Sequence, residues 1–220
     1  MCGRYTLRKP RAHPWLEHAP ELEGIEPAFN IAPGRRVPVV GRNADGDRVV
    51  SLASWGFHPR WLPADARSPI NARAETAGSK PMFRGAFRKG RCLVPADGWY
   101  EWQERDNGPK QPYFFHRPDD ALFWFAGLAA MNEAGERTLA ILTTDANEIS
   151  KAVHPRMPVV LGDDERAAIW LDPGADDQTL QGLLMPAEDG LVETYPVSRR
   201  VNRPANDEPA CVEREQESAP

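Results

Sequence analysis

The sequence has few cysteines, no long apolar run and no excess of positive charge. Its 220 residues include only Cys2, Cys92 and Cys211, which are too few and too widely spaced for a disulfide framework or a zinc site. No hydrophobic run reaches the roughly 18 residues of a membrane helix, and no apolar signal segment follows Met1. We therefore expect a cytoplasmic protein with no membrane contact, no metal and no cofactor.

The net charge of −5 argues against a uniformly basic surface, but the charge is unevenly distributed. Residues 1–91 carry 16 Lys and Arg against 8 Asp and Glu, whereas residues 92–220 carry 11 against 24. The first part can therefore form an anion-binding groove in an acidic protein. Ordinary solvated surface charge explains the same asymmetry equally simply.

The 22 prolines, spread along the whole chain, favour short strands and loops over long helices. We expect an α+β fold: one β-rich domain over residues 1–205, built on a strongly bent antiparallel sheet or barrel. A polar, acidic tail over 206–220 is predicted to be disordered. Cys92 is expected to be buried in a strand and Cys211 to lie in the mobile tail. The expected strands are 4–7, 37–40, 49–55, 91–102, 113–116, 122–128 and 138–143.

A few helices accompany these strands. Asp163 is a suitable N-cap for a helix over 164–171, and a second helix is expected over 177–184. Weaker helical patterns cover 11–18 and 147–153.

The second residue, Cys2, carries the sharpest chemical signal. Removal of Met1 before a small residue would leave a free 1,2-aminothiol whose amine has an ordinary pKa near 8. Such an amine attacks carbonyl groups, and the neighbouring thiol can close a five-membered thiazolidine ring. Gly3 lets a reactant approach the backbone closely, and Arg4 adds a fixed cation. A chance cysteine at a frayed end is the alternative.

Two further clusters combine polar groups with strand-like sequence. If residues 70–73 are extended, Asn71 and Arg73 share one face, where an amide and a guanidinium could hold a phosphate; a capped turn is the alternative. Glu101 lies among Trp99, Tyr100 and Trp102 in an apolar run. A buried carboxylate there would have a raised pKa suited to acid–base catalysis, unless the side chain points to water at a sheet edge.

A histidine and a tryptophan complete the set of candidate residues. His154 follows a possible helix and titrates near neutrality, so it could move protons, or it could simply stabilise a proline-rich turn. Arg156, two residues on, could bind phosphate. Trp55 and Phe57 are expected in the core, whereas Trp61 on the following loop could stack on bases.

Taken together, these blocks resemble the SOS-response-associated peptidase (SRAP) family of abasic-site processing proteins. They occur in order over about 200 residues and form a specific set. The matching blocks are residues 1–4, 29–34, 55–57, 71–76, 95–102, 154–158 and 196–198.

The resemblance implies a monomeric SRAP domain that binds single-stranded DNA containing abasic sites and associates with the nucleoid through DNA. It implies loss of Met1 and a thiazolidine crosslink between Cys2 and the opened sugar, with lyase and self-directed peptidase activity as secondary reactions. The implied catalytic residues are Cys2, Asn71, Glu101 and His154. The implied DNA-binding residues are Arg4, Asn30, Pro33, Trp61, Arg73 and Arg156.

Two other functions fit part of the sequence. An N-terminal-nucleophile glutamine amidotransferase would use a Cys2 thiolate to release ammonia from glutamine, but it leaves Glu101 and His154 unexplained. A non-catalytic single-strand-binding module would explain the arginines and tryptophans and make Cys2 dispensable.

Overall fold

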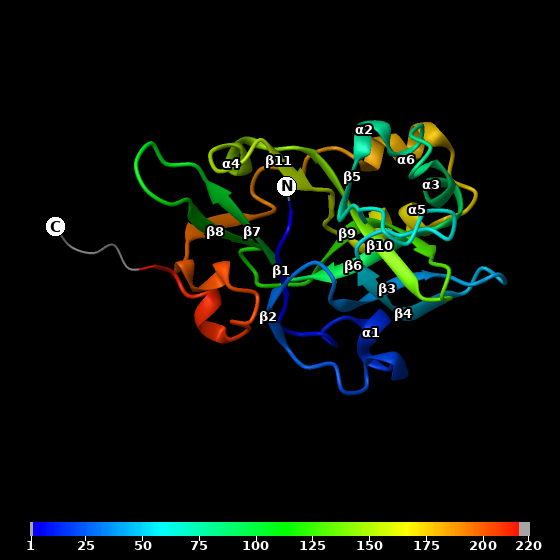
Figure 1. Ribbon diagram of the computed structural model, residues 1–220, viewed down its shortest axis with the longest axis horizontal. Helices are drawn as coiled ribbons and strands as arrows, with labels where there is room; N and C mark the ends of the chain where they lie inside the picture. Colours follow the sequence, from blue (N-terminus) through cyan, green and yellow to red (C-terminus); the bar gives the residue numbers. More distant parts are fainter. Residues whose placement is uncertain (1, 216–220) are drawn as a thin grey trace.

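The computed structural model describes residues 2–215, and β-strands dominate its regular structure. The strands form two sheets, one of five strands and one of eight. Figure 1 shows β7 and β8 of the smaller sheet on the left and the larger sheet in the centre and right. Helices α2, α3, α5 and α6 lie at the right-hand end. Among the described residues, no helix is long and apolar enough to span a membrane.

The smaller sheet is antiparallel throughout and has β1 near one edge. Its order is β13–β8–β7–β1–β2, so the first strand of the chain lies between β2 and β7. These strands are β1 (Tyr5–Leu7), β2 (Ala28–Ile31), β7 (Gly98–Gln103), β8 (Gln111–His116) and β13 (Glu193–Pro196).

The larger sheet curls into a ring, because β10 pairs with both β9 and β4 along the path β4–β3–β6–β9–β10. The predicted bent sheet is confirmed, although β10 pairs in parallel with β4 and β5. The strands are β3 (Arg36–Arg42), β4 (Arg48–Trp55), β5 (Asn71–Arg73), β6 (Arg91–Ala96), β9 (Phe123–Met131), β10 (Arg137–Asp145), β11 (Arg156–Pro158) and β12 (Val160–Leu161).

The helices are short, and their ends follow the capping residues. Asp163 accepts a hydrogen bond from the Arg166 N–H at 2.7 Å, which confirms the predicted N-cap. The two weaker helical patterns are realised only as single turns. The helices are α1 (Pro14–Glu17), α2 (Ala74–Ala77), α3 (Arg84–Lys89), α4 (Glu148–Lys151), α5 (Asp164–Leu171) and α6 (Asp177–Leu183), with 3₁₀ turns at Pro20–Leu22, Arg199–Asn202 and Pro209–Cys211.

The single strand predicted over 91–102 is instead two strands in different sheets, divided at Asp97. β6 belongs to the ring and β7 to the smaller sheet. Gly98 is required after the break, because a Cβ there would lie 2.3 Å from the Phe114 ring. An apolar run shows burial but not which sheet buries it, and so the sequence could not reveal the crossover.

The core fills the ring and the space between the sheets. Trp99 stacks on Phe115 with 4.9 Å between ring centroids, and Tyr5 contacts Trp55 edge-to-face at 5.4 Å. These four side chains are at most 1% exposed. Full burial of each large side chain contributes about 1.5–3 kcal/mol, so this contact region is a major stabilising element. Cys92 is also buried, as expected for its strand.

Residues 206–215 are folded onto the domain, which corrects the prediction of a disordered tail beginning at Asn206. Cys211 is fully buried, and its Sγ donates to the Asn206 carbonyl at 3.3 Å. Arg214 forms a β-bridge with Val197. The acidic composition was misleading because Asp207 accepts hydrogen bonds from the main chain of β2. Residues 216–220 lie outside the described residues.

Candidate active site at the start of the chain

Cys2 lies immediately before β1, and its side chain is fully buried in the core. Burial raises the pKa of the Cys2 thiol well above its ordinary value, and the nearby Glu101 carboxyl raises it further. A backbone hydrogen bond from Arg4 opposes these effects. The thiol is therefore protonated at neutral pH in this arrangement. Met1 lies outside the described residues.

Strand pairing brings Glu101 to the start of the chain. Tyr5 pairs with Trp99, and the Tyr100 N–H donates to the Arg4 carbonyl at 3.0 Å. Because β1 and β7 run antiparallel, the next residue of β7, Glu101, lies beside the residues that precede Arg4. The Glu101 side chain is thus carried to the neighbourhood of Cys2 by the sheet itself.

The environment of Glu101 matches the expectation of a buried carboxyl group. The residue is 3% exposed, and burial raises its pKa to about 7, against the lowering effect of the positive charge at the amino terminus. A carboxyl group with this pKa can both donate and accept a proton near neutral pH. The interpretation of Glu101 as a solvent-facing edge residue is excluded by its burial.

His154 lies between α4 and β11, close to the end of β7. The Gln103 side-chain amide donates to the Ala152 carbonyl at 2.8 Å, which ties β7 to the segment before His154. Desolvation lowers the pKa of His154, and a hydrogen bond with the Arg156 main chain opposes this effect. The positive charges of the amino terminus, Lys110 and Arg156 lower the pKa further. Neutral imidazole is therefore favoured at pH 7, and such a ring can accept a proton.

The main chain of Arg156 orients the His154 ring. The Arg156 N–H donates to His154 Nδ1 at 3.0 Å. The same Nδ1 lies 3.0 Å from the Arg156 carbonyl oxygen, to which it donates when Nδ1 carries the ring proton. The main chain of Arg156 therefore fixes the plane of the imidazole in either tautomer.

Asn71 and Arg73 share one face of β5, as the extended interpretation predicted. Ala72 between them is 1% exposed, whereas Asn71 is half-buried and Arg73 is exposed. The Asn71 amide donates to the Ile141 carbonyl at 3.4 Å. Its Oδ1 is buried and has no hydrogen-bond partner among residues 2–215, so an acceptor is available there.

Core contacts connect β5 to β1. The Tyr5 ring contacts Trp55, and the Trp55 indole N–H donates to the Ile70 carbonyl at 2.9 Å. Ile70 immediately precedes Asn71. Rigid aromatic packing therefore fixes the position of Asn71 relative to β1, the strand that follows Cys2.

Arg156 is held by protein carboxylates, and its assignment as a phosphate-binding residue stays a prediction. Its guanidinium contacts Glu75 at 2.6 and 3.0 Å and Asp145 at 2.7 Å, and it donates to the Thr143 carbonyl at 2.6 Å. The side chain is 15% exposed. These bonds fasten α2 to β10 and β11, so Arg156 positions the elements that carry Asn71, Arg73 and His154.

Asn30 and Arg4 are also used inside the protein. Asn30 is 1% exposed, and its amide donates to the carbonyls of Val201, Arg203 and Asn206 at 2.6–3.1 Å. Arg4 donates to Asn30 Oδ1 at 2.8 Å and to the Val201 carbonyl at 2.6 Å. The expectation that Asn30 lines an open groove is wrong, because the C-terminal segment covers it and occupies its amide.

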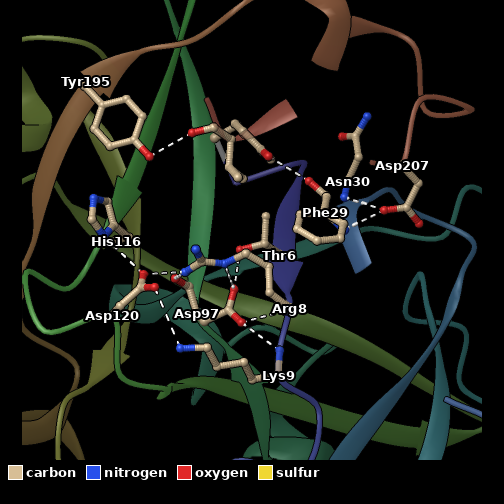
Figure 2. Close-up of polar contacts among 12 residues, drawn as sticks. Thr6, Arg8, Lys9, Phe29, Asn30, Asp97, His116, Asp120, Tyr195 and Asp207 are labelled. Carbon is tan, nitrogen blue, oxygen red and sulfur yellow. Dashed lines mark hydrogen bonds and ion pairs between the residues drawn. The ribbon is translucent and has the colours of Figure 1, made fainter. Parts of the chain in front are cut away.

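Figure 2 shows the polar network that anchors this part of the molecule. Asp207 accepts from the N–H groups of Phe29 and Asn30 at 2.5 and 2.9 Å. Asp97 accepts hydrogen bonds from Thr6 in β1 and from Arg8, which follows β1. Sequence inspection assigned no role to either carboxylate: within the 95–102 block only Glu101 was considered, and Asp207 was placed in the acidic tail.

The remaining predicted residues are accessible to a ligand. Pro33 is exposed in the turn after β2, and Trp61 is 61% exposed on the loop before β5. Within residues 2–215, no cluster of three His, Cys, Asp or Glu side chains could hold a metal ion. The site thus brings a thiol, a carboxyl group with a pKa near 7 and a neutral imidazole to the start of the chain.

Comparison with known proteins identifies the fold and the family. Residues 1–204 match the family described as SOS response associated peptidase (SRAP). The chain is 36% identical to abasic site processing protein YoqW of Bacillus subtilis (strain 168), covering 97% of this chain and 99% of the relative. It is 34% identical to abasic site processing protein HMCES of Gallus gallus, covering 84% of this chain and 66% of the relative.

A solved structure of a protein from Bacteroides thetaiotaomicron shares the fold. Its TM-score is 0.85 at 24% identity, and the match covers 98% of this chain and 100% of the other. The sequence blocks, the sheet architecture and the match over nearly the whole length agree. The chain therefore belongs to the SOS response associated peptidase family.

Proposed function

We propose that this protein captures abasic sites in single-stranded DNA by forming a thiazolidine between Cys2 and the opened sugar. The convergence of Cys2 and Glu101 at the start of the chain carries the proposal, together with the pKa of about 7 for Glu101. The names of relatives that process abasic sites support the same substrate.

The reaction begins when loss of Met1 makes Cys2 the terminal residue. Its neutral amine attacks C1′ of the open-chain aldehyde and gives a carbinolamine. Glu101 donates a proton to the departing hydroxyl, water leaves, and an imine forms. The Cys2 thiol then adds to the imine carbon, and its proton moves to the nitrogen. The balance is one water lost per adduct.

The other groups of the site direct this sequence of steps. The unpartnered Asn71 Oδ1 can accept a hydrogen bond from the amine or the sugar and orient the attack. His154, held neutral, accepts protons released during closure and returns them on reversal. Arg73 binds a phosphate next to the lesion, Trp61 stacks on a base, and Pro33 borders the strand. Arg4 adds positive charge while holding the C-terminal segment.

The imine can also react in a second way. Elimination of the 3′ phosphate from the imine would break the strand, which is the lyase reaction. Closure by the Cys2 thiol removes the imine and prevents that break. We assign any peptidase activity to the protein's own chain, at Met1–Cys2 or beside the adduct.

The glutamine amidotransferase alternative is disfavoured by the same geometry. That mechanism requires a Cys2 thiolate. Burial and the Glu101 carboxyl both raise the pKa of the thiol and disfavour the thiolate. Thiazolidine closure has no such requirement, because a neutral thiol can add to a protonated imine.

A crosslinking experiment with and without borohydride separates the two steps. Wild-type protein should crosslink to an abasic oligonucleotide without reductant. Cys2→Ala, which keeps the amine, should crosslink only when borohydride reduces the imine. A reductant-independent crosslink in Cys2→Ala would refute the thiazolidine, and ammonia release from glutamine by the wild type would favour the alternative.

A further inference from the structure

Two neighbouring hollows of the described surface are lined by Arg and Lys side chains and by no Asp or Glu. A hollow of about 640 Å³ lies between Trp61 and helix α3 and is lined by Arg84, Arg88 and Lys89. A neighbouring hollow of about 400 Å³ shares Arg88 and Lys89 and adds Arg42 and Arg91. Within residues 2–215, no Asp or Glu lines either hollow. We call these residues, with Trp61, the α3 track.

Other hollows of the same molecule do not have this property. The hollow that contains Arg117 and Arg166 is also lined by Asp163 and Glu188. Another combines Arg36 and Arg137 with two glutamates. In a chain with a net charge of −5, a surface whose charged lining residues are all cations suits an anionic ligand.

The shape of the first hollow fits a polymer better than a small anion. Small residues, including Gly85, Ala86, Ala129 and Ala130, contribute to its lining and leave room between the larger side chains. Gly90 cannot carry a side chain here, because a Cβ would lie 2.3 Å from the Ala129 carbonyl oxygen. On the rim, Trp61 is 61% exposed on a loop held by a 3.0 Å hydrogen bond from the Arg60 N–H to the Met131 carbonyl.

The α3 track is continuous in sequence with the candidate site. The loop that carries Trp61 leads directly into β5, and β5 leads through α2 into α3. The Phe57 N–H donates to the Pro69 carbonyl at 2.9 Å, and its ring packs against Phe83, so the loop and α3 form one unit. Figure 1 shows α2, α3 and β5 in the same upper right part of the molecule.

We propose that the α3 track binds the DNA strand that flanks the abasic site, with Trp61 stacking on a base and Arg84, Arg88 and Lys89 contacting successive phosphates. This inference rests on the proposed function and extends it, because it continues the binding surface for the same substrate from Trp61 onto the cations of α3. Exposed aromatic rings beside a cationic groove form a sequence-tolerant platform for single strands.

The choice of residues for the test follows from their contacts. Arg42 and Arg91 hold the end of α5, since they donate to the carbonyls of Leu171 and Trp170 at 3.0 and 2.7 Å. They are left unchanged to protect the fold. Arg84 and Arg88 are exposed on α3, so the double variant Arg84→Ala/Arg88→Ala removes two charges without opening the core. The matched control is Arg11→Ala/Arg36→Ala, which removes two exposed cations outside the track.

The experiment measures the crosslinking rate at subsaturating protein on oligonucleotides with one abasic site and one flank lengthened at a time. The wild-type rate should rise with the length of one flank. The double variant should react at the wild-type rate on the shortest oligonucleotide, and its rate should not rise when that flank is lengthened. For the double variant, the slope of log rate against log salt concentration should be about 1.4 less negative than for the wild type. This difference corresponds to about a 20-fold slower reaction on long strands at 0.1 M salt.

The outcomes separate the two proposals. If wild-type protein crosslinks to no abasic oligonucleotide, the proposed function fails. If crosslinking occurs but the rate does not depend on flank length, the inference alone is overturned. The same conclusion follows if the double variant and the control behave alike. Binding of an acidic peptide, rather than DNA, that is lost only in the double variant would also overturn it.

Discussion

Two buried carboxyl groups four residues apart, Asp97 and Glu101, show how neighbours decide the role of a residue. Asp97 is 2% exposed and Glu101 is 3% exposed. Asp97 accepts hydrogen bonds at 2.5–3.2 Å from Thr6, from Arg8 and from the Lys9 N–H, and its charge is matched. Burial instead raises the pKa of Glu101 to about 7. The first group stabilises the sheet junction, and the second is available for proton transfer.

Removal of Asp97 should have the largest effect on stability. In Asp97→Ala, three donors and the Arg8 charge lose their buried acceptor, so the free energy of unfolding should fall by about 3–5 kcal/mol. Urea denaturation measures the change. Asp119→Ala is the matched control, because it removes an exposed ion pair with Arg117 and should change stability by less than about 1 kcal/mol. Equal effects of the two variants would contradict the structural role of Asp97.

The pH dependence of stability should show that Glu101, unlike Asp97, destabilises the folded protein when it is charged. Its pKa is raised in the folded state, so its contribution is fully present below the unfolded pKa of about 4.5 and is lost as the pH rises through about 7. The difference between wild type and Glu101→Gln should therefore change by about 3 kcal/mol between pH 4.5 and pH 8, with the variant gaining relative stability at high pH. A pH-independent difference would mean that Glu101 titrates normally.

The same substitution should slow crosslinking. Glu101→Gln removes the proton donor for imine formation, and the rate at neutral pH should fall about 100-fold. Glu104→Gln is the matched control on the same segment, because Glu104 is exposed and pairs with Lys110, and it should leave the rate unchanged. Stopped-time gel assays measure both rates. A Glu101→Gln variant as fast as the wild type would exclude Glu101 from proton transfer.

Asp207, in the C-terminal segment, resembles Asp97 in that its carboxylate accepts hydrogen bonds from main-chain N–H groups. Asp207→Ala leaves the N–H groups of Phe29 and Asn30 without their acceptor, so the free energy of unfolding should fall by about 1–3 kcal/mol. Limited proteolysis after residue 205 should become faster in parallel. Unchanged stability and proteolysis would show that the segment does not anchor the sheet.

The sequence predicted the general fold, and it singled out the side chains that the structure brings to the candidate site, because local patterns mark both. Short apolar runs located β3, β4, β9 and β10, and Asp163 located the start of α5. The burial and raised pKa of Glu101 also followed from a carboxylate placed within a run of aromatic residues.

Contacts between distant segments were not predictable in the same way. In the sequence, nothing near Arg156 indicates its partner Glu75, because the two residues are 81 positions apart. The burial of Asn30 was equally hidden, because its amide donates to the carbonyl of Val201, which is 171 positions away. The acidic end of the chain suggested disorder, because composition does not reveal that main-chain N–H groups of β2 donate to Asp207.

The most direct test of the account is the intact mass of the protein after incubation with a single-stranded oligonucleotide that carries one abasic site. We predict a stable product without reductant whose mass equals that of the protein lacking Met1, plus the oligonucleotide, minus one water. Peptide mapping should locate the modification at Cys2. Protein that has lost Met1 and shows no adduct, or an adduct elsewhere in the chain, would contradict the central claim.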